Sequence, residues 1–473
     1  MPEPTLEEIM QPESIAVVGA SKIGIGANYI SALLKLNFKG KIYPVHPKYQ
    51  EVFGLKCYAG IYDIPGNVDL VISLISSTQA LKLVDDCAQK GVKCIHFYTA
   101  RFAETGRPEA IELEKEILRR AKSAGIRIIG PNCMGIYYPA RGISWEPTMS
   151  AIPGPMGFIS QSGSVAYETI GTAEIRGLHY SKGFSYGNAI DFNECDYLEY
   201  LSQDAETKLI TMYVEGIRDG KRFLEILRKT TMKKPVIILK GGRGKSGTRA
   251  TASHTASLAG SMEVWNAAMK QAGAISVVDL EELLDVAAAF YFLPPAYRNH
   301  AGIAGGGGGG SVIAADVCEE AGLDVIPLPD EIRADLRKQN NPIWDWVTNP
   351  VDFSIALKDA VSGYITKMMV NNPNFDLSII FIDPQGHGKV TSSDVLLSDF
   401  PLDDLKIKPL LVVLLDRGRS FKDTAGETNK QFIEISTKLI EKHIPAYVSV
   451  ARAANAAVKM INYYKRQRAD LTQ

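Results

Sequence analysis

Residues 15–26 read IAVVGASKIGIG, an apolar β-branched run that passes through Gly19, Ala20 and Ser21 into a helical pattern. A strand that ends in small residues and continues as a helix is the first unit of a doubly wound α/β domain. The same order recurs twice, where Gly157–Ile159 runs into Gln161-Ser162-Gly163-Ser164 and Gly302–Ala304 runs into Gly305–Gly310 and Ser311. The three starts predict three such domains.

Further apolar runs alternate with helical patterns along the chain, which predicts parallel sheets with helices on both faces. The predicted strands are Ile15–Gly19, Lys41–Val45, Leu70–Ile75, Cys94–Tyr98 and Arg127–Ile129, then Gly157–Ile159, Leu209–Val214, Val236–Leu239 and Ile275–Val278, and finally Gly302–Ala304, Leu377–Ile382, Leu410–Leu415 and Tyr447–Val450. Segments rich in proline and glycine at 139–155 and 293–300 separate the thirds. We therefore predict domains at 1–140, 155–293 and 300–463, followed by a tail at 464–473.

The composition excludes several classes of protein. The 473 residues hold 52 Lys and Arg against 53 Asp and Glu, a net charge of −1, so nothing favours nucleic acid or an anionic membrane surface as a partner. The longest apolar runs, Leu410–Leu415 and Val286–Leu293, are far shorter than the roughly 20 residues of a membrane span. The start, MPEPTLEEIMQPES, lacks the pattern of a signal peptide. Six cysteines without a CxxC pair suit reduced thiols in a cytoplasm, and neither a disulfide framework nor a zinc site.

The first loop indicates the kind of ligand. It is not GxGxxG, and the second predicted strand is not followed by the acidic residue that binds the ribose hydroxyls of NAD. Lys48 stands there instead, in the run His46-Pro47-Lys48. Because a lysine suits a phosphate, we expect an adenine nucleotide with an extra phosphate, which is NADP or coenzyme A.

Two more loops follow strands of the same sheet and should lie on its ligand-binding edge. One holds Thr99, Ala100 and Arg101, and the other holds Asn132 and Cys133. The Asn132 amide suits either the amides of a pantetheine arm or a local turn, and the residues favour neither. No base is adjacent to Cys133 in the sequence, which favours a buried structural thiol.

His254 lies in a stretch of small residues. Between 240 and 262 there are four basic residues and no acidic one: Lys240, Arg243, Lys245 and Arg249. A neutral imidazole is a nucleophile at neutral pH, and basic neighbours favour a phosphoryl donor. Glu215, at the end of a strand one βα unit earlier, is a candidate to orient the ring. From these residues alone, a catalytic histidine and a solvated loop histidine are equally supported.

Six segments together resemble a known family. They are VVGASKIGIG (17–26), FYTARFAETG (97–106), GPNCMG (130–135), GFISQSGSVAYE (157–168), ASHTASLAGSMEVWNAAMKQAGAISVVDLEELLD (252–285) and TNPVDFS (348–354). They resemble α subunits of NDP-forming acyl-CoA synthetases of the ADP-forming acetyl-CoA synthetase type, which are relatives of succinyl-CoA synthetase. The resemblance implies a Rossmann-like CoA-binding domain followed by two flavodoxin-like domains.

The resemblance also implies a reaction, acyl-CoA + NDP + phosphate ⇌ carboxylic acid + NTP + CoA, through an acyl phosphate and a phosphohistidine. His254 would carry the phosphoryl group and Glu215 would orient it. Ser162, Gly163 and Ser164 would bind phosphate. The substrate coenzyme A would bind to Gly19, Ala20, Ser21, Lys22, Lys48, Thr99, Ala100 and Asn132. Two features depart from the family pattern, Arg101 in place of a small residue and the six plain glycines at 305–310.

No segment resembles the family's ATP-grasp domain. The resemblance therefore implies a β subunit that carries this domain together with ADP or ATP and Mg²⁺, in an α2β2 heterotetramer in the cytoplasm. The alternative is a non-catalytic CoA-binding scaffold or regulatory protein. An NADP-dependent oxidoreductase is permitted by Lys48, but the missing glycine fingerprint disfavours it.

Overall fold

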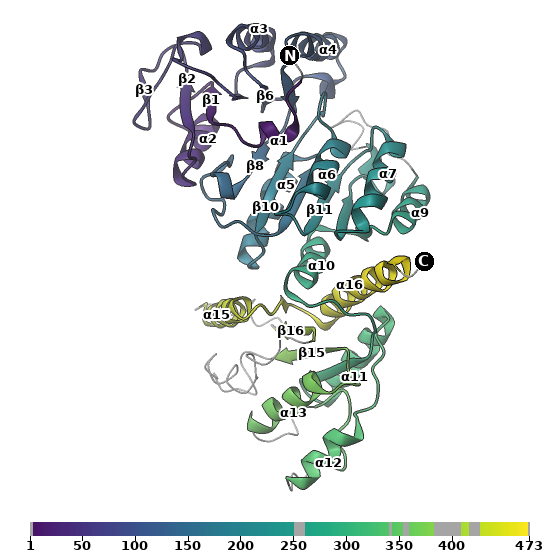
Figure 1. Ribbon diagram of the computed structural model, residues 1–473. Coiled ribbons are helices and arrows are strands. Elements are labelled where there is room, and N and C mark those ends of the chain that lie inside the picture. The colour runs from purple at the N-terminus through teal and green to yellow at the C-terminus, as the bar shows by residue number, and fades with distance from the viewer. Residues whose placement is uncertain are drawn as a thin grey trace. The chain divides into compact units, whose positions relative to one another are not determined.

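The computed structural model describes residues 3–249, 261–339, 343–352, 359–382, 408–415 and 426–471 (Figure 1). The chain forms two compact units, Met1–Leu280 and Glu281–Gln473. The first unit holds two large sheets and the second holds one. The predicted boundaries at 1–140, 155–293 and 300–463 stay a prediction.

The first sheet consists of five parallel strands in the order β2-β1-β5-β6-β7. Their bounds are β1 Ser14–Val18, β2 Lys41–Val45, β5 Leu70–Ser73, β6 Cys94–Phe97 and β7 Arg127–Ile129. The main helices around them are α2 Gly24–Lys35, α3 Ala80–Lys90 and α4 Pro108–Ser123, while α1 Leu6–Ile9 precedes the sheet and the short strands β3 Glu51–Val52 and β4 Leu55–Lys56 form a hairpin. Counted along the chain, the strand order is 2-1-3-4-5. The order reverses between β1 and β5, and such a reversal is where ligands bind in open α/β sheets.

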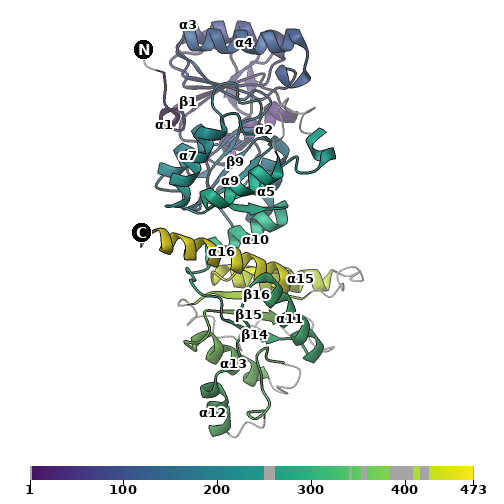
Figure 2. The same ribbon diagram turned by 90° about the vertical axis from the view of Figure 1, so that its right-hand side faces the viewer.

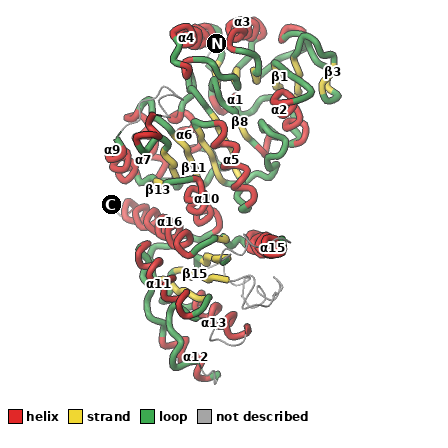
Figure 3. Tube along the Cα trace, turned by 180° about the vertical axis from the view of Figure 1, so that it is seen from behind, coloured by secondary structure: helices red, strands yellow, loops and turns green. Residues whose placement is uncertain are grey.

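The second sheet has the order β13-β12-β11-β9-β10-β8. Its strands are β8 Gly135–Tyr137, β9 Met156–Ser160, β10 Tyr180–Ser185, β11 Leu209–Val214, β12 Val236–Lys240 and β13 Ile275–Val277. Helices α5 Gly163–Ile175, α6 Glu194–Gln203, α7 Gly220–Thr231 and α9 Met262–Ala272 flank it (Figure 3). Five strands are parallel, again in the order 2-1-3-4-5, and β8 pairs antiparallel with β10 at the edge. Since β8 directly follows the loop after β7, residues 130–134 connect the two sheets.

The second unit is built on four parallel strands in the order β14-β15-β16-β17. They are β14 Ala301–Gly305, β15 Leu377–Ile382, β16 Leu410–Leu414 and β17 Ala446–Tyr447, with helices α10 Leu280–Phe292, α11 Gly308–Ala321, α12 Asp330–Lys338, α13 Asp359–Asn371, α15 Glu427–Glu441 and α16 Val450–Leu471. Helix α16 packs on α11 and on three of the strands (Figure 2). Its Arg452 pairs with the buried Asp285 of α10, and Lys459 pairs with Glu282. Within the described strands, the order of this sheet shows no reversal.

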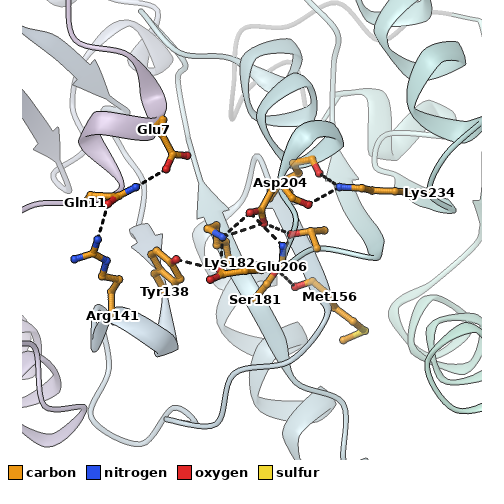
Figure 4. A network of polar contacts seen from close by, with 12 residues as sticks. Glu7, Gln11, Tyr138, Arg141, Met156, Ser181, Lys182, Asp204, Glu206 and Lys234 are labelled. Carbon is orange, nitrogen blue, oxygen red and sulfur yellow. Dashed lines mark hydrogen bonds and ion pairs between the residues drawn. The ribbon is translucent and has the colours of Figure 1, made fainter.

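Every predicted strand has a counterpart, but β3, β4, β8 and β10 were not predicted. Strand β10 reads YSKGFS and is buried at all six positions, although half of it is polar. Lys182 donates to Asp204 at 2.9 Å and pairs with Glu206, while Ser181 donates to the Met156 carbonyl at 2.8 Å (Figure 4). Partners from distant segments therefore satisfy the polar side chains of this strand, and an apolar pattern does not reveal it. No helix in the described ranges is long and apolar enough to cross a membrane.

Candidate active site

The first loop wraps closely over the start of α2. Gly19 has a φ of +93°, and its N–H donates to the Val45 carbonyl of β2 at 3.0 Å, as does that of Ala20 at 3.2 Å. A Cβ on Gly26, in the first turn of the helix, would lie 2.7 Å from Ser21 Oγ. The residue before the helix, Ile23, provides no side-chain cap. The first N–H groups of α2 are thus left for solvent or an anion.

The other predicted CoA-binding residues follow strands of the same sheet and so lie on its carboxyl edge. Lys22 and Lys48 are exposed, and neither forms an ion pair within the described residues. Thr99 is tied to the scaffold, because its Oγ1 donates to the Ile75 carbonyl at 2.9 Å and its carbonyl accepts from Asn132 N–H at 3.1 Å. Ala100 is exposed. These positions form one edge that begins after β2 and ends after β7.

Asn132 and Arg101 both have left-handed backbones, with φ of +60° and +80°. Asn132 Nδ2 donates to Asn188 Oδ1 at 3.4 Å, a weak contact, and within the described ranges its side chain makes no other hydrogen bond. The Arg101 loop is held by Glu104, whose Oε1 accepts from the N–H groups of Arg101 and Phe102. The left-handed backbone favours a turn role for Asn132, and a role toward a ligand stays a prediction.

Cys133, in the same loop as Asn132, behaves as the sequence predicts. It is 4% exposed, and burial raises the pKa of its thiol. The predicted burial of this thiol is confirmed, and its structural role stays a prediction.

The loop that connects the sheets brings two predicted sites together. Gly187, after β10, has a φ of +54°, and a Cβ there would lie 2.2 Å from the carbonyl oxygens of Pro131 and Asn132. A Cβ on Gly163 would lie 2.9 Å from Met134 Cγ. The loop with the predicted CoA contact thus packs against the start of α5, where phosphate binding is predicted.

The predicted phosphate loop, residues 162–164, is ordered by its serines. Ser162 is the N-cap of α5, and its Oγ accepts from Val165 N–H at 3.4 Å and lies 3.1 Å from Ser164 Oγ. Ser160 Oγ donates to the Ser162 carbonyl at 2.7 Å. The N–H groups of Gly163 and Ser164 have no acceptor in the part of the chain that the structure describes. Unpaired N–H groups at a helix N-terminus suit an anion.

Glu215, after β11, is a buried carboxylate that is only partly satisfied. The residue is 7% exposed, and Oε1 accepts one hydrogen bond, from Tyr213 Oη at 3.2 Å. Oε2 is buried and has no partner among the described residues. Buried polar atoms are nearly always paired, so an unpaired carboxylate oxygen indicates a partner that is not among these residues.

Two further side chains hold the Glu215 backbone: Gln161, which the sequence did not indicate, and Lys240. Gln161 Oε1 accepts from the N–H groups of Glu215 at 2.8 Å and Gly216 at 3.1 Å. From the other side, Lys240 Nζ donates to the Glu215 carbonyl at 2.6 Å. Burial lowers the pKa of Lys240, and the charge of Glu215 opposes this shift. Lys240 was counted in the basic loop, but it is 6% exposed and belongs to the end of β12.

His254 lies outside the described residues. Residues 245–249 form a helical turn, although their content of glycine, serine and threonine favours a loop.

In the six-glycine run, Gly305 and Gly306 have φ of +129° and +63°, and Cβ atoms there would meet Phe381 at 2.2 and 2.4 Å. Nothing in the described residues explains glycine at 309 and 310.

Comparisons with known proteins identify the family. Residues 13–139 match the model of a CoA binding domain, and residues 153–290 match that of a succinyl-CoA ligase like flavodoxin domain. The chain is 32% identical over 470 residues to the α subunit of acetate–CoA ligase [ADP-forming] I of Pyrococcus furiosus, and the match covers 98% of each chain. The chain belongs to the α-subunit family of ADP-forming acetate–CoA ligases.

Other members of the family agree. The α subunit of the P. furiosus isozyme II is 38% identical over 375 residues, which is 79% of this chain and 81% of that one. The structure also resembles that of a dinucleotide-forming acetyl-coenzyme A synthetase 1 from Candidatus Korarchaeum cryptofilum, solved with phosphate and ADP. The TM-score is 0.83 at 30% identity, over 99% of this chain and 98% of that chain. The resemblance and the α/β fold class predicted from the sequence are confirmed.

Proposed function

We propose that this chain catalyses the acyl-CoA and phosphate steps of an ADP-forming acyl–CoA ligase, acyl-CoA + NDP + phosphate ⇌ carboxylic acid + NTP + CoA. Membership of the α-subunit family over the whole chain favours a catalytic role over a scaffold. The observation that carries the chemical proposal is the buried Oε2 of Glu215, which has no partner among the described residues and follows the strand to which Gln161 ties the predicted phosphate loop. Glu215 offers an acceptor, and the Gly163 and Ser164 N–H groups offer donors.

Coenzyme A would bind along the carboxyl edge of the first sheet. The tight loop at Gly19, Ala20 and Ser21 and the uncapped start of α2 suit its pyrophosphate. Lys22 and Lys48 are exposed ammonium groups, and Lys48 follows β2, where a dinucleotide fold carries its ribose-reading residue. We assign Lys48 to the 3′-phosphate. Thr99, Ala100 and Asn132 would bind the remainder of the molecule near the thioester.

The chemistry begins with phosphate held by Ser162, Gly163 and Ser164. A phosphate oxygen attacks the thioester carbonyl, the C–S bond breaks, and the CoA thiolate leaves and takes up a proton. The imidazole of His254 then attacks the phosphorus of the acyl phosphate, which releases the carboxylate. Glu215 Oε2 accepts from the other ring N–H and stabilises the positive charge that forms on the ring. The phosphohistidine finally transfers its phosphoryl group to the NDP.

The NDP site would lie on a partner. The relatives named α subunits imply a β subunit. We propose that this β subunit has an ATP-grasp domain, binds ADP and Mg²⁺, and assembles with this chain as α2β2. All six cysteines are free and buried, which suits a reducing cytoplasm.

Reconstitution tests the proposal. The pure chain should bind CoA but form no ATP from acetyl-CoA, ADP and phosphate, and adding the ATP-grasp subunit should start turnover. The histidine should become labelled by [γ-³²P]ATP, with the acid-labile and base-stable behaviour of an N-linked phosphate. His254→Ala should lose the label and turnover and keep CoA binding. ATP formation by the chain alone, or wild-type labelling of His254→Ala, would contradict the proposal.

A further inference from the structure

Gln161 links the predicted phosphate loop to the end of the strand that carries Glu215, and no other described side chain joins these two parts of the site. It directly precedes the N-cap Ser162 of the phosphate loop, and its own N–H donates to the Tyr213 carbonyl of β11 at 3.0 Å. Its side-chain oxygen accepts from the N–H groups of Glu215 and Gly216, at 2.8 and 3.1 Å. One residue thus fixes the end of the strand that carries Glu215 to the base of the loop that would bind phosphate.

These two hydrogen bonds decide which way the amide faces. Both partners are backbone N–H donors, so the group that meets them must be the amide oxygen, and the alternative flip would place donor against donor. The nitrogen Nε2 is therefore fixed beside the oxygen, with its two hydrogens directed elsewhere. It has no acceptor in the described ranges, and it is not among the buried polar atoms that lack a partner. A fixed, accessible donor remains next to Glu215.

The surrounding groups indicate what this donor meets. The N–H groups of Gly163 and Ser164 also lack acceptors among the described residues, and Glu215 Oε2 is a buried acceptor with no donor. Lys240 Nζ adds a positive charge behind the Glu215 carbonyl. Three donors and a cation suit the oxygens of a phosphoryl group, while the carboxylate suits a ring N–H.

We infer that Gln161 is a further catalytic residue of the reaction, whose Nε2 donates to an oxygen of the phosphoryl group as it moves from the acyl phosphate to His254. Its amide oxygen at the same time keeps Glu215 in place. The inference rests on the proposed function, and it assigns two different tasks to the two ends of one amide. The tasks can be separated because glutamate has the same shape but no donor.

The experiment compares Gln161→Glu with Gln161→Met in the full chain with its ATP-grasp partner. The glutamate keeps an acceptor for the Glu215 and Gly216 N–H groups and loses the donor, whereas methionine loses both. We expect kcat/KM for phosphate to fall roughly 10- to 100-fold in both variants, the range for one hydrogen bond to a charged group. CoA affinity and the melting temperature of Gln161→Glu should stay at wild-type values. Gln203→Glu, on the exposed end of α6, controls for the added charge.

Two further measurements test whether the fall in kcat/KM comes from the loss of the Nε2 hydrogen-bond donor. Equilibrium dialysis with ³²P-orthophosphate on the chain alone should show weaker phosphate binding for Gln161→Glu than for the wild type. The activity of Gln161→Glu relative to the wild type should rise as the pH falls, because a protonated carboxyl again donates a hydrogen bond. Wild-type kcat/KM and phosphate binding in Gln161→Glu, with a loss only in Gln161→Met, would reduce Gln161 to an anchor and overturn the inference. If the wild type neither binds phosphate nor turns over, the proposed function fails as well.

Discussion

Replacing Glu215 by glutamine separates the effect of this carboxylate on the stability of the fold from its effect on phosphoryl transfer. Glu215 is 7% exposed, with one hydrogen bond of 3.2 Å to Oε1 and none to Oε2 within the described residues. Glutamine keeps the shape and an acceptor for Tyr213 Oη, and it removes a buried charge at the expense of an unpaired amide N–H. Both penalties are of the order of 1–3 kcal/mol, so we expect the free energy of unfolding to change by about 1 kcal/mol at most.

The effect on turnover should be much larger. If Oε2 accepts from the imidazolium of His254, the lost interaction is a hydrogen bond between two charged groups, worth about 1.5–3 kcal/mol. At tenfold per 1.36 kcal/mol, the rate of phosphoryl transfer falls about 10- to 150-fold. Labelling of the chain by [γ-³²P]ATP and the partner, followed by rapid quench, measures that step directly.

A matched variant keeps the charge. Tyr213→Phe removes the hydrogen bond to Oε1 and leaves the carboxylate in place, so we expect a rate within about fivefold of the wild type. A wild-type labelling rate for Glu215→Gln would refute the assignment of Oε2 to the histidine. A fall of more than about 3 kcal/mol in its unfolding free energy would instead show that the carboxylate holds the fold.

Three other predictions concern the first unit. Lys48→Ala should weaken CoA binding about 10- to 100-fold and dephospho-CoA binding less than about twofold in calorimetric titration, and equal weakening would exclude a 3′-phosphate contact. Arg127→Ala leaves the Asp191 carboxylate, whose side chain is 5% exposed and which binds Arg127 Nε at 2.7 Å, without its ion partner. Urea denaturation should show a loss of about 3 kcal/mol, against less than about 0.5 kcal/mol for the surface variant Arg119→Ala. Burial lowers the pKa of His96 to about 4, so the unfolded chain binds a proton first as the pH falls from 6.5. Stability should drop by up to about 3 kcal/mol between pH 6.5 and pH 4, and the drop should be smaller in His96→Gln.

The sequence predicts the parts of this fold that depend on apolar pattern. Strand β1 is buried at all five positions and reads SIAVV, and Leu410–Leu414 is buried throughout and reads LLVVL. Strand β10 is buried to the same degree, but Lys182 and Ser181 are satisfied by Asp204, Glu206 and the Met156 carbonyl. These partners come from other parts of the chain. The alternation of apolar and polar residues within the strand therefore does not reveal the pairing.

The candidate site likewise contains residues that the sequence predicts and one that it does not. Loops at the carboxyl ends of parallel strands can be placed from the strands alone, so the sequence predicts Lys48, Asn132, Ser162 and Glu215 as candidates. Gln161 acts through hydrogen bonds to backbone N–H groups, which every residue except proline has. The sequence therefore contains no sign of its partner. The only hint was its position, directly before the two serines of the phosphate loop.

The segment between β7 and β8 explains why the two predicted binding sites of the first unit lie together. It leaves the first sheet at Ile129 and joins the second at Gly135, so five residues must connect both edges. Gly187 and Gly163 have no room for a side chain against Pro131, Asn132 and Met134, and Ser185 Oγ accepts from Met134 N–H at 3.0 Å. A ligand that moves Asn132 must therefore also move Gly187, whereas it is Met134 that contacts the start of α5. If CoA binds at the first sheet as proposed, we expect its thioester to face the Ser162–Ser164 loop. Enlarging Gly187 should then impair phosphate transfer while leaving the proposed Lys48 contact intact.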